Sequence, residues 1–180
     1  MHFLSYFYNK NLKFDLINKF NYTNLKKLPK LKKIVLNFSC KTTELKTLAT
    51  HLLALELITN QKGILTISKQ PNLLLKLRRG NPTGCKLTLK KAFIFSFLSK
   101  NLTEIFPKTK NFTGITISQK IEKTAISFVI KEALNFSELT EQYYLFNNLS
   151  SLNLSFIISV KTKNETLFLL KSLQFPLNTL

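Results

Sequence analysis

The chain has 180 residues, 44% of them apolar, so it can bury a core and is too apolar for a disordered chain. It carries 27 Lys and Arg against 9 Asp and Glu, a net charge of +18. This excess excludes an ordinary metabolic enzyme surface as the default and indicates a polyanionic partner, a nucleic acid or an anionic membrane. With two Cys and two His, the sequence predicts no disulfide scaffold, no metal site and no cofactor.

The positive charge is concentrated in the first part of the chain. Residues 1–103 carry 19 basic and 3 acidic side chains, whereas residues 104–180 carry 8 and 6. Because solvated surfaces usually mix both signs, this asymmetry predicts that the polyanion contacts the first 103 residues.

The composition also indicates where the gene lies. Only two basic residues are Arg, and Lys, Phe, Leu, Ile and Asn are abundant, which is typical of an AT-rich genome such as that of many organelles. The first residues lack the pattern of a transit peptide or a signal peptide. The sequence therefore predicts a protein that is encoded and made inside an organelle.

Residues 1–20 place apolar side chains near helical spacing, which predicts a helix that ends at Asn21. Residues 31–38 then alternate, which predicts a strand with one apolar and one more polar face. The apolar set is Ile34, Leu36 and Phe38, and the opposite set is Lys33, Val35 and Asn37.

A second helix is predicted from Thr43, as its cap, to about Thr59. His51 lies on this helix and is expected to be partly exposed and without a functional role. Residues 64–68 are β-branched and strand-like. Residues 70–84 are predicted to form a long loop because prolines and glycines punctuate them.

Residues 85–90 alternate again and predict a further strand. Its inward set is Cys85, Leu87 and Leu89, and its outward set is Lys86, Thr88 and Lys90. Cys85 is therefore expected to act as a small buried apolar side chain and not as a reactive thiol.

Residues 92–106 predict an apolar helix that Pro107 stops, and residues 152–160 predict a strand. Asn164 is expected to cap a short helix that ends before Pro176. Strands and helices that do not alternate strictly favour an α+β fold, an antiparallel sheet with helices packed on one face in a single domain.

Motifs of catalysis are missing from the sequence, which has no Gly-rich phosphate loop, no HExxH and no GxSxG. The one local acidic group, Glu132, Glu138 and Glu141, is typical of a solvated face. The sequence therefore predicts that the protein is not an enzyme.

Features that suit a nucleic acid are more specific. If the two alternating strands share a sheet, its polar face offers ammonium groups for phosphates, and hydroxyl and amide groups for sugar or base edges. The loop carries Lys76, Arg78 and Arg79 beside three Leu. A long flexible basic loop can reach a second RNA; alternatively, Leu73, Leu74 and Leu75 extend a buried strand.

Several segments resemble one ribosomal protein family. KLRRGNPTGCKLTLK at 76–90 fits the pattern K-x-R-x-G-x-P-x-G-C-K-x-T-L-basic, and FNY at 20–22, KIVLNF at 33–38 and NQKG at 60–63 fall at the expected places. With these segments the chain resembles universal large-subunit ribosomal protein family number five, in its organellar form. Residues 1–115 are clearly family-like, and residues 116–180 have diverged.

The resemblance implies an antiparallel sheet with helices on one face, whose open face holds 5S rRNA or an equivalent large-subunit rRNA in the central protuberance. On matched positions the rRNA-binding role falls to Lys33, Asn37, Gln61, Lys86, Thr88 and Lys90. The basic loop is implied to reach the elbow of the peptidyl-site tRNA through Gln70, Asn72, Leu73, Lys76, Arg78, Arg79 and Gly80.

The implied protein partners are neighbouring large-subunit proteins and a small-subunit head protein across an intersubunit bridge. The implied location is the mitochondrial matrix ribosome, with a plastid-type organelle as the alternative. Two rival functions stay open: a peripheral protein on anionic lipid, and an RNA-binding module outside the ribosome. No membrane span is predicted, because the longest uncharged run, residues 142–160, is interrupted by Asn and Ser.

Overall fold

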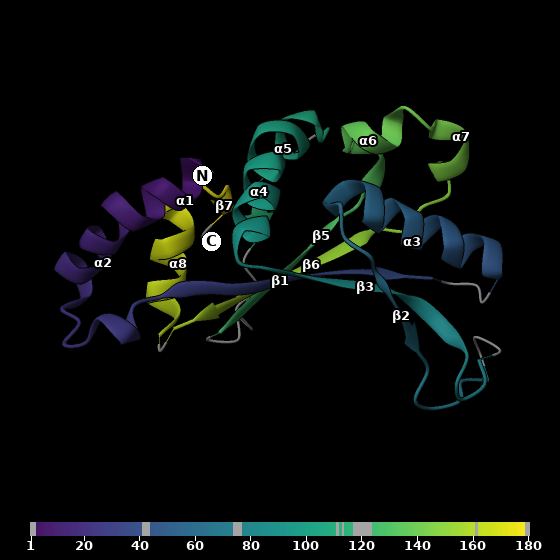
Figure 1. Cartoon of the computed structure of the whole chain (residues 1–180), viewed down its shortest axis with the longest axis horizontal. Coiled ribbons are helices and arrows are strands. Elements are labelled where there is room, and N and C mark those ends of the chain that lie inside the picture. The colour runs from purple at the N-terminus through teal and green to yellow at the C-terminus, as the bar shows by residue number, and fades with distance from the viewer. Residues whose placement is uncertain are drawn as a thin grey trace. The chain divides into compact units, whose positions relative to one another are not determined.

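The computed structural model describes residues 3–40, 44–73, 77–110, 112, 114–116, 124–160 and 162–178 (Figure 1). Its main feature is a five-stranded antiparallel sheet of order β2-β3-β1-β6-β5, accompanied by helices, which confirms the predicted α+β class. These strands are β1 (Lys30–Ser39), β2 (Ile64–Ile67), β3 (Pro82–Lys90), β5 (Ala125–Ile130) and β6 (Leu152–Ser159). A small parallel sheet pairs β4 (Ile115–Thr116) with β7 (Leu177–Asn178).

The longer helical segments come before and between the strands. They are α1 (Phe3–Phe7), a π-turn (Tyr8–Leu12), α2 (Lys13–Phe20), α3 (Leu45–Thr59), α4 (Ala92–Lys100), a second π-turn (Asn101–Ile105) and α8 (Lys163–Ser172). The shorter ones are α5 (Phe106–Lys108), α6 (Ser137–Thr140), α7 (Tyr143–Phe146) and two 3₁₀ turns (Leu25–Lys27 and Ala133–Asn135).

Contacts divide the chain into two compact units. Unit 1 consists of Met1–Ile34, Leu89–Phe128 and Ser155–Leu180, and unit 2 consists of Val35–Thr88 and Val129–Leu154. Strands β1, β3, β5 and β6 each contribute residues to both units. The single domain expected from the sequence stays a prediction.

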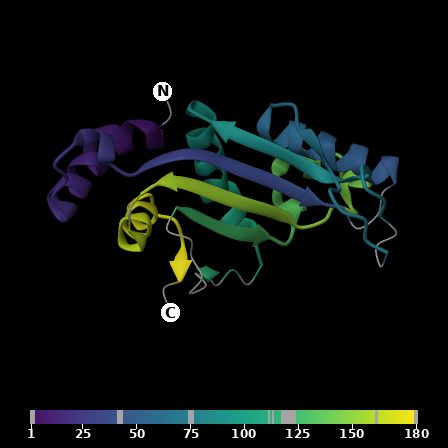
Figure 2. The same cartoon turned by 90° about the horizontal axis from the view of Figure 1, so that it is seen from below.

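In unit 2, helix α3 packs against α6 and α7. All three helices lie on one side of the unit's strands, and Figure 2 views the strands from the other side. Leu48 and Leu55 of α3 are buried with Phe38 of β1 and Leu87 of β3. This helix side of the strands is therefore the core of the unit.

In unit 1, α1 packs against α4 and α2 packs against α8. An aromatic cluster fills much of this core, with neighbouring ring centroids 4.9 to 5.6 Å apart. Its members are Phe106, Phe112, Phe128, Phe156 and Phe175. Such tilted and edge-on pairs add specific geometry to a large buried apolar area.

The predicted helix ends are partly right. Asn21 ends α2 in the left-handed conformation with φ 46°, and its N–H donates to the Ile17 carbonyl at 2.9 Å. Pro107 does not stop the second apolar helix. The π-turn before it resets the hydrogen-bond register, so Pro107 lies in the first turn of α5, where its missing N–H costs nothing.

Two predicted caps and one loop boundary need correction. Thr162, and not Asn164, caps α8, because its hydroxyl accepts from the Glu165 N–H at 3.4 Å. Helix α3 begins after Glu44, and the predicted cap Thr43 lies outside the described residues. Strand β3 begins at Pro82, so the loop before it is shorter than predicted.

His51 is buried, with 3% of its surface exposed, and the prediction of partial exposure was wrong. Its ring packs edge-on against Phe38, with centroids 5.3 Å apart. Its Nε2 accepts from the Ser150 backbone N–H at 3.0 Å, so the ring proton lies on Nδ1, beside the Thr47 carbonyl. His51 thereby joins α3 to the segment before β6.

We predict that His51→Phe lowers the free energy of unfolding by about 1 to 3 kcal/mol, because it keeps a ring but leaves the Ser150 N–H without its acceptor. Urea titration measures the effect. Thr50→Ala, on the same helix, is the control and should change the value by about 0.5 kcal/mol or less. A His51→Phe chain as stable as the wild type would contradict the role of this hydrogen bond.

Candidate nucleic-acid interface

Strand β1 separates apolar from polar side chains as the sequence predicted. Ile34, Leu36 and Phe38 are fully buried at 0% exposure. Lys33 and Asn37 alternate with them and are half-buried on the opposite side of the strand. Because side chains of a strand alternate, Lys33 and Asn37 lie on the side away from the buried row.

Strand β3 lies next to β1 in the sheet and alternates in the same way. Cys85, Leu87 and Leu89 are at most 3% exposed. Its outward set is Lys86 and Lys90, which are exposed, and Thr88, which is half-buried. The condition set from the sequence, that both strands belong to one sheet, is therefore met.

A glycine lets β3 approach β1 in unit 2. A Cβ built on Gly84 would overlap the carbonyl oxygen of Phe38. Beside it, the Cys40 N–H donates to the Thr83 carbonyl at 3.0 Å. The glycine of the G-C-K segment is therefore required by a close backbone approach.

Gln61 lies in the turn between α3 and β2 and is half-buried. The turn starts at Asn60, which adopts the left-handed conformation with φ 53°. Three residues after Gln61, Ile64 pairs with Lys86 in the antiparallel β2–β3 register. Gln61 is thus placed at the start of the hairpin, off the strands that carry the other predicted rRNA-binding residues.

The basic loop is partly held by hydrogen bonds and is not simply flexible. Ser68 exchanges backbone bonds with Asn81 at 2.9 Å and with Gly80 at 3.0 Å. Further along, Asn72 and Leu77 form a reciprocal pair at 2.9 Å. The loop therefore continues the hairpin of β2 and β3, and Figure 1 shows it extending away from α3.

The loop presents its side chains to solvent. Arg78, Arg79, Gln70 and Asn72 are exposed, and Gly80 adopts a positive φ of 90°. Leu73 is 94% exposed, so it does not extend a buried strand. Lys76, Leu74 and Leu75, which the sequence also placed here, lie outside the described residues.

The Cys85 thiol is inert, as predicted. It is fully buried and donates to the Leu48 carbonyl at 3.5 Å. Burial, with a smaller contribution from Cys40, raises its pKa from 9.0 to about 11. The thiol therefore stays protonated near neutral pH and is not a nucleophile.

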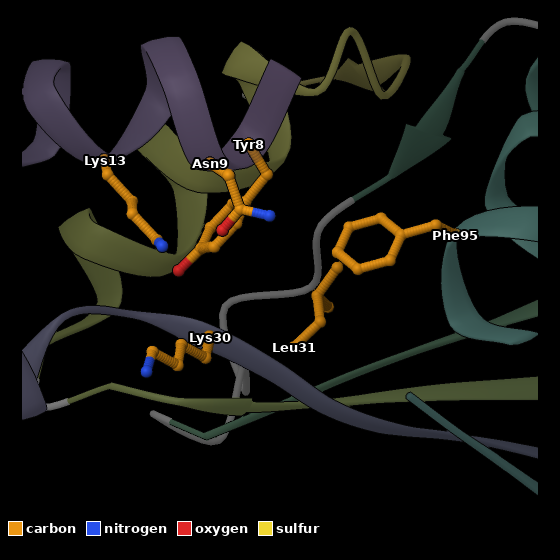
Figure 3. A pocket seen from close by; sticks show the side chains of 6 residues that line it. All are labelled: Tyr8, Asn9, Lys13, Lys30, Leu31 and Phe95. Carbon is orange, nitrogen blue, oxygen red and sulfur yellow. The ribbon is translucent and has the colours of Figure 1, made fainter. Parts of the chain in front are cut away.

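Sequence reasoning missed one feature of unit 1, an open cavity of about 220 Å³ (Figure 3). Its lining residues are Tyr8, Asn9, Lys13, Lys30, Leu31 and Phe95. They come from three separate segments, so no local pattern indicates the cavity. In the described ranges, no three His, Cys, Asp or Glu gather as metal ligands, and no helix is long and apolar enough to cross a bilayer.

The chain is similar to known ribosomal proteins. The model of the C-terminal part of the ribosomal protein uL5 family matches residues 82–177. Large ribosomal subunit protein uL5m of Reclinomonas americana is 36% identical over 173 residues, covering 95% of each chain. The uL5 proteins of Malacoplasma penetrans and Geotalea daltonii are each 33% identical; the matches cover 94% and 96% of this chain and 90% and 97% of those proteins.

We predict that the free energy of unfolding falls as pH rises above about 9. Burial raises the pKa of Cys85 to about 11, so the folded chain favours the protonated thiol. The resulting stability is complete below the ordinary pKa of 9.0 and is lost as pH rises through about 11. Denaturant titrations at several pH values should show a smaller decline for Cys85→Ala than for the wild type; equal declines would contradict the assignment.

Proposed function

The chain belongs to the ribosomal protein uL5 family, as a structural, non-enzymatic protein of the large ribosomal subunit, and we propose that the outward sides of β1 and β3 bind 5S rRNA. The observation that carries this proposal is the alternation of both strands. Each strand buries an apolar row and turns its lysines, together with an amide on β1 and a hydroxyl on β3, to the other side.

The chemistry of these side chains suits an RNA backbone. Lys33, Lys86 and Lys90 supply ammonium groups for phosphates, which is the main source of affinity in such interfaces. Asn37 and Thr88 supply groups that can both donate and accept hydrogen bonds, as the 2′-hydroxyl of RNA requires. Gln61 adds an amide at the start of the neighbouring hairpin.

The hairpin loop is proposed to contact the peptidyl-site tRNA. Arg78 and Arg79 are exposed, and a guanidinium can bind a phosphate with two parallel hydrogen bonds. The backbone bonds at Ser68 hold the base of the loop, so its tip is presented away from α3. Gln70, Asn72 and Gly80 belong to the same contact, as does Lys76.

The remaining contacts are proposed from family membership. A small-subunit head protein needs an exposed surface in residues 116–180, and α7 offers Tyr143, Tyr144 and Leu145, which are 57%, 93% and 52% exposed. We place the protein in the mitochondrial ribosome, encoded by the organelle, because the Reclinomonas americana relative carries the name uL5m. An anionic membrane is disfavoured, since the basic residues alternate along strands and do not flank an apolar helix face.

We predict that Thr88→Ala with Lys90→Ala weakens 5S rRNA binding by at least about tenfold at fixed salt, through loss of a phosphate contact and a hydrogen bond. Filter binding or fluorescence anisotropy with purified RNA measures the change. Lys46→Ala with Thr50→Ala removes the same side-chain types from α3 and should leave the affinity within about twofold. Equal affinities of wild type and the β3 variant would refute the assignment.

We predict that deleting residues 72–79 spares rRNA binding and weakens tRNA retention in the peptidyl site. The bond between the Gly80 N–H and the Ser68 carbonyl lies outside the deletion and still closes the hairpin. Arg78→Gln with Arg79→Gln should give the same defect in smaller degree, whereas Lys62→Gln, on the turn before β2, should not. Loss of rRNA binding on deletion would show that the loop serves the wrong RNA in this account.

A further inference from the structure

The cavity of unit 1 lies between the first helices, the beginning of β1 and helix α4 (Figure 3). Lys30 alternates with Ile34 through Lys32, so it lies on the opposite side of β1 from Lys33. The cavity is therefore separate from the outward side of β1 that the proposed rRNA site uses.

A π-turn builds one wall of the cavity. In this turn the Lys13 N–H donates to the Tyr8 carbonyl, five residues earlier. This wider spacing brings Tyr8 and Lys13 to the same side of the helix, whereas an α-helix would turn them further apart. Such π-turns within helices occur frequently at functional sites.

The aromatic side chains of the cavity are held in place. Tyr8 is 7% exposed, and its hydroxyl donates to the Pro29 carbonyl at 2.6 Å. Burial raises the pKa of this hydroxyl to about 12, so it remains a donor at neutral pH. The Phe95 ring lies 6.3 Å from the Tyr8 ring at 41° and is half-buried, leaving part of its surface toward the opening.

The polar side chains carry positive charge and an acceptor. The Lys13 ammonium is 5.6 Å from the centre of the Tyr8 ring, Lys30 is exposed, and none of the six lining residues is acidic. The Asn9 amide NH₂ donates to the Ser5 carbonyl at 2.9 Å, so the amide oxygen is the group available to a ligand.

We propose that this cavity binds one unstacked base of single-stranded RNA. The base lies against Phe95, Lys13 and Lys30 contact the flanking phosphates, and the Asn9 oxygen accepts from an exocyclic amino group of the base. The cavity, at about 220 Å³, is smaller than the roughly 300 to 1,000 Å³ typical of sites for drug-sized ligands, so it takes a single ring system with the sugar and phosphate outside.

An acidic peptide segment is the competing occupant. It would satisfy the two lysines, but its carboxylate would be repelled by the Asn9 oxygen and would make no use of the Phe95 surface. The proposal rests on the proposed function only in taking RNA as the partner, and it adds a second RNA contact on the helix side of the chain.

The test uses the full chain and a fluorescent single-stranded oligoadenylate in anisotropy titrations. Phe95→Leu keeps an apolar side chain but removes the flat ring, and it should weaken binding by about 5- to 150-fold, the range found for lost base stacking. Phe95→Tyr should restore the affinity to within about twofold. This pair separates stacking from folding, because both variants fill the space in α4.

Charge variants supply an independent readout. Lys13→Gln with Lys30→Gln should reduce the slope of log affinity against log salt by about 1.4, from two lost phosphate contacts on a single strand. Lys10→Gln with Lys19→Gln removes two exposed lysines of the same segment that do not line the cavity and should leave the slope unchanged.

Unchanged oligoadenylate binding by Phe95→Leu would overturn the proposal. So would tighter binding of a labelled oligoglutamate peptide that depends on Phe95, which would identify a protein segment as the occupant. The Thr88→Ala and Lys90→Ala chain separates the two proposals. If it binds 5S rRNA normally while the Phe95 effect persists, the β3 assignment fails and the cavity stands; the reverse result removes only the cavity.

Discussion

The buried row on one side of β1 determines where the polar groups of this strand point. Ile34, Leu36 and Phe38 are fully excluded from solvent. A slip of one residue would turn Lys33 and Asn37 into the core and expose the apolar row, at a cost of several kcal/mol for the unpaired groups. The register of the strand, and the position of its amide and ammonium groups, therefore follow from packing.

The same constraint explains why the chain functions by positioning and not by catalysis. Its cations lie on exposed or half-buried positions of strands and loops whose backbone is held by hydrogen bonds. Most of them are Lys, which acts as a point charge toward phosphate, and the two Arg lie on the hairpin loop. Family membership agrees, since the uL5 proteins are structural components of the large subunit.

How well the sequence predicted each element depended on how local its cause is. Alternation in β1 and β3 is a period of two residues, so it was visible and correct. The burial of His51 depends on Ser150, 99 residues away, which no local pattern shows. The helix through Pro107 depends on a π-turn, and the cavity combines three segments. The turn of Gln61 was placed by resemblance alone.

The most direct test is ultraviolet crosslinking in purified organelles, followed by sequencing of the attached RNA and identification of the crosslinked peptide. The account predicts that 5S rRNA is attached to peptides from β1 and β3. Crosslinks of rRNA confined to α3, α6 or α7 would contradict it, because these helices lie on the other side of the strands in unit 2.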